Sequence, residues 1–331
     1  MLNKNKINII SVSGYGWSGS SAVVDFMKGF KDTKAIETEF RLLKDPGGIM
    51  DLESALLDNW DVMKNGLAIN DFITLINILN RKHIKMFQMG GSYGVTVSND
   101  FLRQSYDYIN DLVDFKFNGD SLIFDYSLSR FQYFLKRVRK RVLRAYAKEI
   151  YFSKPSREAF RKATQSYLSC VLRDFANKHE CRNVVLDQAI PASNIKKSLS
   201  YFDKIKIIIV DRDPRDVYCD MYNHKSLIYS QGHNEIYSVN NFIKWFRAQR
   251  DAESQRGLKG EILKVKFEDL VNDYAVTSEI IKDFIGLDME LDPNKRCFHP
   301  EKSIKNIGIY KNHSNKKAIE LIDSELNEYY K

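Results

Sequence analysis

The segment 7–27, INIISVSGYGWSGSSAVVDFM, constrains the fold of this chain more than any other part of the sequence. The apolar run 7–12 predicts a buried strand, and Gly14, Gly16 and Gly19 predict a tight turn after it. Apolar residues then recur at helical spacing up to Met27. A strand, a glycine turn and a helix in this order point backbone N–H groups and the positive end of a helix dipole at one place. The segment therefore predicts an α/β fold with an anion-binding loop.

The spacing of this loop matches that of a nucleotide-binding P-loop at every position except one. Gly14 and Gly19 have the P-loop spacing, but Ser20 stands where a nucleotide triphosphatase has lysine. We therefore expect a site for a phosphate-like group that is not an ordinary ATP site. A glycine and serine turn that binds no ligand is the alternative that this segment alone leaves open.

Three further apolar runs, at 184–186, 205–210 and 261–266, predict core strands that are each followed by a helical pattern. Strands that alternate with helices favour a P-loop-like, three-layer α/β/α fold around a central parallel sheet. In such sheets, ligands bind beyond the carboxyl ends of the strands. The glycine loop, Asp187-Gln188 and Asp211-Arg212 all follow predicted strands. We therefore expect them to lie along one edge of the sheet.

The length and composition are consistent with one domain that carries a large insertion. The chain has 331 residues, of which 44% are hydrophobic, and this is ample for a core. We expect a single domain over residues 1–331, with a mostly helical insertion at about 52–176 in which Asn118-Gly119 forms a turn. The sequence shows no signal-peptide pattern and no apolar stretch that could span a bilayer, so a cytoplasmic location is expected.

The segment 134–146 is the most basic part of the predicted insertion. Its cations alternate with aliphatic residues, and they are Lys136, Arg137, Arg139, Lys140, Arg141 and Arg144. Together with the net charge of +8, this pattern suits an anionic acceptor or anionic lipid headgroups, which makes peripheral membrane contact one expectation. A solvated basic helix face accounts for the pattern equally well.

A second charged motif, Arg212-Asp213-Pro214, follows the predicted strand at 205–210. Pro214 suits the first turn of a helix, and Arg212 at the strand end can bind a phosphate through two N–H groups. With the glycine loop, this motif resembles the sulfotransferases that use 3′-phosphoadenosine-5′-phosphosulfate (PAPS). In that family, a loop similar to Ser18-Gly19-Ser20-Ser21 holds the 5′-phosphosulfate, and an Arg-Asp/Asn-Pro motif holds the 3′-phosphate.

The segment 302–311 resembles the late loop with which the same family covers the adenosine and the 3′-phosphate. Here Lys302, Lys305 and Lys311 would supply cations, and Gly308 would allow close approach of the backbone. The resemblance is nearest to bacterial carbohydrate sulfotransferases and tyrosylprotein sulfotransferases, and it implies PAPS as donor and no metal. The residues that it assigns to the cofactor site are Gly16, Trp17, Ser18, Gly19, Ser20, Ser21, Arg212, Asp220, Lys302, Lys305, Gly308 and Lys311.

The segment Glu37-Thr-Glu-Phe-Arg41 is similar to the Glu-x-Arg segment of the tyrosylprotein sulfotransferases and their bacterial relatives. This match implies that Glu39 is the catalytic base and that Arg41 lies beside it. Solvated glutamates before a helix are the alternative.

Three positions depart from the family pattern. Trp17 stands where many members have lysine or arginine, so Arg41, Lys44 or a residue of the helical region would have to replace that cation. Asp220 stands where serine is usual, and we expect it to turn away while Tyr222 or Lys225 substitutes. The strand at 184–186 is followed by Asp187-Gln188, without the lysine that the family often has there.

The sequence thus favours a sulfotransferase that moves a sulfonate from PAPS to a hydroxyl group. The resemblance suggests a carbohydrate acceptor, either a cell-surface polysaccharide or a glycolipid, and no nucleic-acid partner. Two alternatives remain open. One is a P-loop kinase in which Asp211 binds Mg²⁺, and the other is a nucleotide-binding protein without sulfotransferase activity.

Overall fold

The computed structural model describes the chain in segments, which are residues 7–82, 91–119, 125, 128–143, 148–226, 235–251, 261–286, 291–292 and 295–330. The chain divides into two compact units. Unit 1 comprises residues 1–40, 176–199 and 204–331, and unit 2 comprises residues 41–175 and 200–203.

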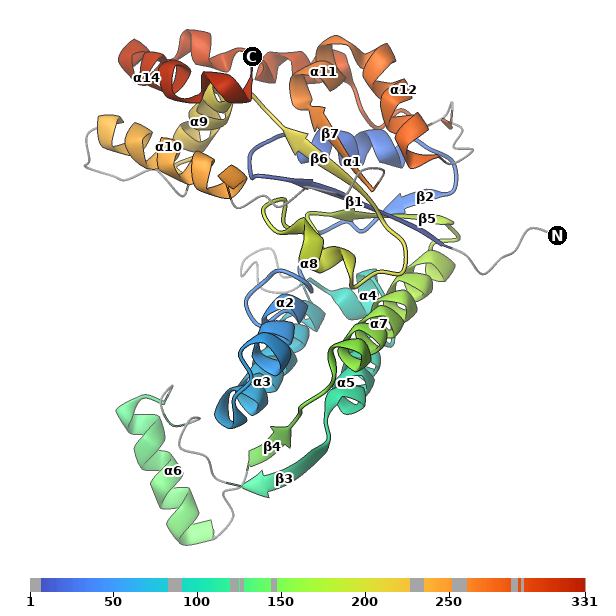
Figure 1. Ribbon diagram of the computed structural model, residues 1–331, viewed down its shortest axis with the longest axis vertical. Coiled ribbons are helices and arrows are strands. Elements are labelled where there is room, and N and C mark those ends of the chain that lie inside the picture. Colours follow the sequence, from blue (N-terminus) through green and yellow to red (C-terminus); the bar gives the residue numbers. More distant parts are fainter. Residues whose placement is uncertain are drawn as a thin grey trace, which may run out of the picture. The chain divides into compact units, whose positions relative to one another are not determined.

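Unit 1 is built on a five-stranded parallel sheet with the strand order β2-β5-β1-β6-β7 (Figure 1). The strands are β1 (Asn8–Gly14), β2 (Thr33–Ala35), β5 (Asn183–Asp187), β6 (Lys206–Asp211) and β7 (Ile262–Lys266). The predicted α/β fold with a central parallel sheet is confirmed, and each of the four predicted runs forms a strand. The register pairs Val12 with Asp187 and Gly14 with Val210, so the residues after these strands emerge at one edge.

Helices of unit 1 flank the sheet and contribute buried side chains to its cores. They are α1 (Ser20–Lys28), α8 (Ile195–Leu199), α9 (Pro214–Asn223), α10 (Glu235–Asp251), α11 (Phe267–Asn272), α12 (Tyr274–Ile285), α13 (Pro300–Ser303) and α14 (Lys316–Leu326). Short 3₁₀ turns are η3 (Ile304–Asn306), η4 (Ile309–Asn312) and η5 (Asn327–Tyr329).

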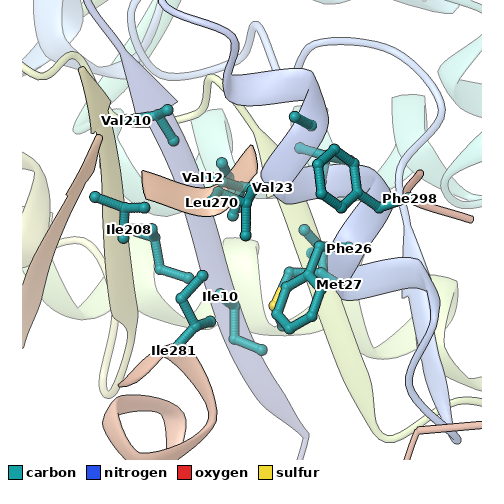
Figure 2. Close-up of a cluster of buried hydrophobic side chains, with 14 of the residues drawn as sticks. Ile10, Val12, Val23, Phe26, Met27, Ile208, Val210, Leu270, Ile281 and Phe298 are labelled. Carbon is teal, nitrogen blue, oxygen red and sulfur yellow. The ribbon is translucent and has the colours of Figure 1, made fainter. Parts of the chain in front are cut away.

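The core under the glycine loop joins β1 and β6 to α1, α11 and α12 (Figure 2). Ile10 and Val12 point from alternate positions of β1 toward Val23 and Met27 of α1. Phe26 packs edge to face on Phe30 with 5.1 Å between the ring centroids. Each fully buried side chain of this kind stabilises the fold by about 1.5–3 kcal/mol, so the start of α1 is held firmly at the end of β1.

Unit 2 contains most of the helices between β2 and β5. Its elements are α2 (Ile49–Glu53), the π-helix η1 (Ser54–Asp58), α3 (Val62–Asn80), α4 (Tyr93–Thr96), α5 (Phe101–Leu112), β3 (Phe115–Gly119), α6 (Arg130–Leu143), β4 (Lys148–Phe152) and most of α7 (Arg157–Lys178). The rings of Tyr108 and Tyr167 stack in its core with centroids 4.7 Å apart, and each hydroxyl is hydrogen-bonded. Unit 2 is thus held by its own buried aromatic cluster.

The expected turn at Asn118-Gly119 is wrong. These two residues belong to β3 and pair antiparallel with Glu149 and Lys148 of β4, so a partner about thirty residues away decides their conformation. The predicted basic segment 134–146 is helical up to Leu143, and residues 144–146 lie outside the described part of the chain. One domain with an insertion at 52–176 stays a prediction. In the described residues, no helix combines the length and apolar character needed to cross a bilayer.

Candidate functional site

The loop between β1 and α1 has three residues with positive φ, a backbone conformation that strongly favours glycine. Gly16 and Gly19 have φ of 83° and 79°, and Trp17 between them has φ of 59°. A non-glycine residue in this region carries a strain of about 1–3 kcal/mol, which the surrounding structure must offset. A Cβ at Gly19 would lie 2.5 Å from the ring of Phe267, so this position also requires glycine for space.

Gln188, which follows β5, braces the loop from the neighbouring strand. Its backbone N–H donates to Val12 O at 2.8 Å, and its Nε2 donates to Ser20 Oγ at 2.7 Å. Gly14 N donates to Gln188 Oε1 at a longer 3.4 Å. A glutamine thus links β1 to α1 at the place where the family pattern led us to look for a lysine. Sequence reasoning missed this role, and the only available signal was its position after a predicted strand.

Arg212 is buried at the carboxyl end of β6. Its side chain is 4% exposed, and its Nη2 donates to Asn306 O at 2.6 Å. Nη1 donates to Trp17 O at 3.2 Å and to Asp220 Oδ2 at 2.5 Å, while Nε is buried and has no hydrogen-bond partner in the described part of the chain. Arg212 therefore ties the loop to η3.

Asp220 does not turn away, so that expectation is wrong. Its carboxylate pairs with Arg212, and both side chains line a cavity of unit 1 that neither Tyr222 nor Lys225 lines. The ion pair explains this orientation, because a buried guanidinium strongly favours a carboxylate neighbour. The free protein therefore holds an anion next to the arginine that the resemblance assigns to a phosphate.

The segment 302–311 is fastened to α9 by Asp216. The buried Asp216 carboxylate accepts hydrogen bonds from Gly308 N at 2.7 Å and Tyr310 N at 3.1 Å. Burial raises the pKa of Asp216, and the two amide donors act in the opposite direction. Gly308 has φ of 72°, which suits glycine at this bend. A buried carboxylate therefore fixes the predicted late loop, and sequence reasoning did not identify it.

A cavity of about 500 Å³ lies between these elements of unit 1. Gly19 and Ser21 of the α1 start, Arg212, and the rings of Phe267 and Phe298 line it. Lys302 and Asn306 complete the side formed by the late loop. The volume is within the range of small-molecule sites. The structure thus brings the loop, Arg212, Asp220 and Lys302 together, whereas the exposed Lys305 and Lys311 do not line this cavity.

The expected catalytic residues lie in different units. Glu39 is exposed and belongs to unit 1. The N–H of the next residue, Phe40, donates to Asp187 O at 2.8 Å, so Glu39 lies near the carboxyl end of β5. Arg41 belongs to unit 2, where its Nε lies 2.6 Å from Asp45 Oδ2. Asp45 therefore already balances the charge of Arg41, which was one of the cations considered as replacements for the one lost at Trp17.

Asp211 is engaged in a manner that disfavours the kinase alternative. Its carboxylate pairs with the buried guanidinium of Arg250 and also accepts from Arg212 N at 2.9 Å. Arg250 in turn packs on the ring of Tyr15 at 4.2 Å. A carboxylate that binds Mg²⁺ needs oxygen atoms that face the metal. Asp211 instead acts as an anchor between β6 and α10.

The sequence model of the sulfotransferase family matches residues 124–291. This match includes Arg212-Asp213-Pro214 but neither the glycine loop nor the segment 302–311, so it is independent of those two motifs. No curated protein sequence matches the chain.

Solved structures similar to this chain include three sulfotransferases. The sulfotransferase domain of the Synechococcus PCC 7002 olefin synthase is 16% identical, over 99% of this chain and 95% of that one, with a TM-score of 0.38. The sulfotransferase domain from the curacin biosynthetic pathway is 14% identical over 97% of each chain, with a TM-score of 0.41. A Mycobacterium avium sulfotransferase is 10% identical, over 98% of this chain and 77% of that one, with a TM-score of 0.38.

Proposed function

Because this chain belongs to the sulfotransferase family, we propose that it transfers a sulfonate from PAPS to a hydroxyl group. The observation that carries the proposal is the cavity in which the first turn of α1 and the buried guanidinium of Arg212 face one ligand-sized space. Two separated anion-binding groups suit a donor that is charged at both ends.

The chemistry of the lining residues fits such a donor. Gly19, Ser21 and Ala22 bring the N-terminal end of α1 to the cavity wall, and the first amides of a helix lack intrahelical partners and suit an anion, although Ala22 N donates to Gly19 O at 3.0 Å. Arg212 lines the cavity, and its Nε is buried without a hydrogen-bond partner among the described residues, which is costly unless a ligand satisfies it. Lys302 adds a second cation to the cavity wall. When bound, PAPS would supply the activated sulfonate.

The remaining catalytic work falls to residues of this chain. Transfer of such a group depends mainly on positioning and on neutralising charge, as in phosphoryl transfer. We assign the sulfonate end to the backbone of residues 17–21 and the 3′-phosphate to Arg212. Glu39 would accept the proton of the acceptor hydroxyl, with Arg41 as the accompanying cation. The motif match supports these two catalytic assignments.

A carbohydrate, as part of a polysaccharide or a glycolipid, is the acceptor class that we propose. The motif resemblance and the basic segment support it. Incubation with PAPS and a panel of oligosaccharides, tyrosine peptides and simple alcohols tests it, with release of adenosine 3′,5′-bisphosphate as readout. Transfer only to peptides or alcohols would contradict the carbohydrate class. Bisphosphate binding without transfer to any acceptor would favour the non-catalytic alternative.

Calorimetric titration tests the donor site directly. Adenosine 3′,5′-bisphosphate should bind without Mg²⁺, whereas Mg²⁺-dependent ATP binding would support a kinase. Arg212→Ala should weaken the bisphosphate by about 10–100-fold, because a charge-assisted hydrogen bond contributes about 1.5–3 kcal/mol. Adenosine 5′-monophosphate should lose much less affinity, and this ligand also reports whether the cavity is intact. Equal losses for both ligands would refute the assignment of Arg212.

Replacement of Glu39 tests the proposed base. Glu39→Gln should lower turnover by about 10²–10⁴-fold, the usual contribution of a general base, and leave bisphosphate affinity unchanged. Glu37→Gln is the matched control, since Glu37 is also exposed and lies two residues away. A rate for Glu39→Gln equal to that of the control would remove Glu39 from the mechanism.

A further inference from the structure

Helix α6 exposes the apolar side that a helix of a globular protein ordinarily buries. Phe131, Phe134, Val138 and Val142 are 68%, 61%, 41% and 72% exposed. Their spacing of three and four residues places them in one stripe along the helix, and Leu135, at 38% exposed, falls in the same stripe. We call these five residues the apolar stripe.

The side of α6 that is buried is a polar one. Lys136 is 6% exposed and pairs with Asp125, whose side chain is 13% exposed. At about 100° per residue, Lys136 projects from the side of the helix opposite the apolar stripe. An amphipathic helix that packs on a protein core has the reverse orientation. The apolar stripe therefore faces away from the contact that Lys136 makes.

Positive charge borders the apolar stripe on both sides. The sequence of α6 contains no aspartate or glutamate. By helical geometry, Arg130, Arg137 and Arg141 lie along one border of the stripe and Arg139 along the other. All four of these arginines are exposed. The helix thus combines an apolar strip with guanidinium groups placed to reach anions beside it.

We propose that α6 is an interfacial helix that docks this protein on an anionic lipid bilayer. Such helices have a strongly basic polar face and insert an apolar face of Phe and Leu at the boundary between headgroups and acyl chains. The apolar stripe would enter that boundary while the bordering arginines bind lipid phosphates. This docking does not depend on the proposed sulfonate chemistry.

Charge selects the bilayer over the other occupants of this surface. A second copy of the chain that docked through its own α6 would bring together two helices that have arginines and no acidic residues. Like charges across an interface are unfavourable. An anionic polymer in water could bind the arginines, but it would leave the apolar stripe exposed. A bilayer with anionic headgroups satisfies the stripe and the arginines at once.

Flotation of the full chain with lipid vesicles tests the proposal. Vesicles of phosphatidylcholine with about a third phosphatidylglycerol should bind the protein at low salt, whereas pure phosphatidylcholine should bind it weakly. High salt should reduce binding, because the arginine contacts are screened. Failure to bind the anionic vesicles at low salt would overturn the proposal.

Two pairs of substitutions separate the contributions of charge and insertion. Arg137→Glu with Arg141→Glu should weaken vesicle binding by about thirtyfold or more, since each lost cation alone costs about fivefold. Phe131→Ser with Phe134→Ser should weaken it by about tenfold or more. Bisphosphate affinity should stay at the wild-type value in both variants, so that failure here is distinct from failure of the proposed function.

Matched controls lie on other helices. Arg161→Glu with Arg173→Glu makes the same charge change on α7, and Val276→Ser with Ile280→Ser removes exposed apolar groups from α12. Both controls should bind vesicles like the wild type. Losses in the controls equal to those in the α6 variants would overturn the proposal. So would full binding by the phenylalanine variant, or a self-association of the wild type that this variant abolishes.

Discussion

Asp220 lies in the cavity wall with its Oδ2 2.5 Å from Nη1 of Arg212. A phosphate that bound Arg212 at this place would therefore approach a carboxylate. At about 4 Å and the effective dielectric constant usual near a protein surface, such a repulsion amounts to about 4 kcal/mol before screening. If Arg212 binds the 3′-phosphate as proposed, the pair preserves the orientation of Arg212 in the free protein at the expense of affinity for that phosphate.

Asp220→Ser should consequently tighten binding of adenosine 3′,5′-bisphosphate, by about tenfold once solvent screening is allowed for. Affinity for adenosine 5′-monophosphate should change little, because that ligand lacks the 3′-phosphate that would approach Asp220. Calorimetry with both ligands measures the difference. Unchanged or weaker bisphosphate binding would show that Asp220 does not face the 3′-phosphate.

At the scale of elements, the late loop is attached to α9 through Asp216, in addition to the hydrogen bond of Arg212 to Asn306 O. The carboxylate of Asp216 in α9 accepts hydrogen bonds from the backbone N–H groups of Gly308 and Tyr310, at the start of η4. The same stretch of chain carries Lys302 and Asn306 into the cavity wall. The position of the loop is therefore linked to α9, which begins directly after the Arg212-Asp213 pair.

Asp216→Asn should loosen this loop. An amide side chain offers one acceptor oxygen and presents an NH₂ group where the carboxylate accepted a second hydrogen bond. Leaving a buried donor unsatisfied costs about 1–3 kcal/mol, so bisphosphate affinity should fall by about 5–100-fold. Hydrogen exchange should accelerate at 304–312 while α9 stays protected. Normal protection of 304–312 would contradict the role of Asp216.

The elements that sequence predicted well are those whose own residues determine their structure. β1, β6 and the turn into α1 follow from apolar runs and from glycines at positive φ. β3 was missed because it is mostly exposed and has no continuous apolar run, and β4, despite the apolar residues 150–152, was missed because its partner lies about thirty residues away. The roles of three side-chain contacts were missed for a related reason. Gln188 and Asp216 bind partners that are distant in sequence, and the spacing of Arg212 and Asp220 did not indicate that they form an ion pair.

At the scale of the whole molecule, the chain passes between the two units four times. One of the two segments that form unit 2 is short. Residues 200–203 belong to unit 2, although α8 before them and β6 after them belong to unit 1. Within this short segment, Tyr201 is 1% exposed, and its hydroxyl donates to the buried Glu53 at 2.5 Å. Loss of structure in unit 2 would release residues 200–203, which are joined through the backbone to α8 and β6 of unit 1.

We therefore expect the two units to unfold in one cooperative transition. Tyr201→Phe removes a hydrogen bond to a buried carboxylate and should lower the free energy of unfolding by about 1–3 kcal/mol. Tyr133→Phe, at an exposed tyrosine, should leave it unchanged. Bisphosphate at a hundred times its Kd should add about 2.7 kcal/mol to that same transition, although its proposed site lies in unit 1 alone. Circular dichroism and tryptophan fluorescence during urea unfolding measure both effects. Two separate transitions, with the ligand shifting one and Tyr201→Phe the other, would show that the units unfold independently.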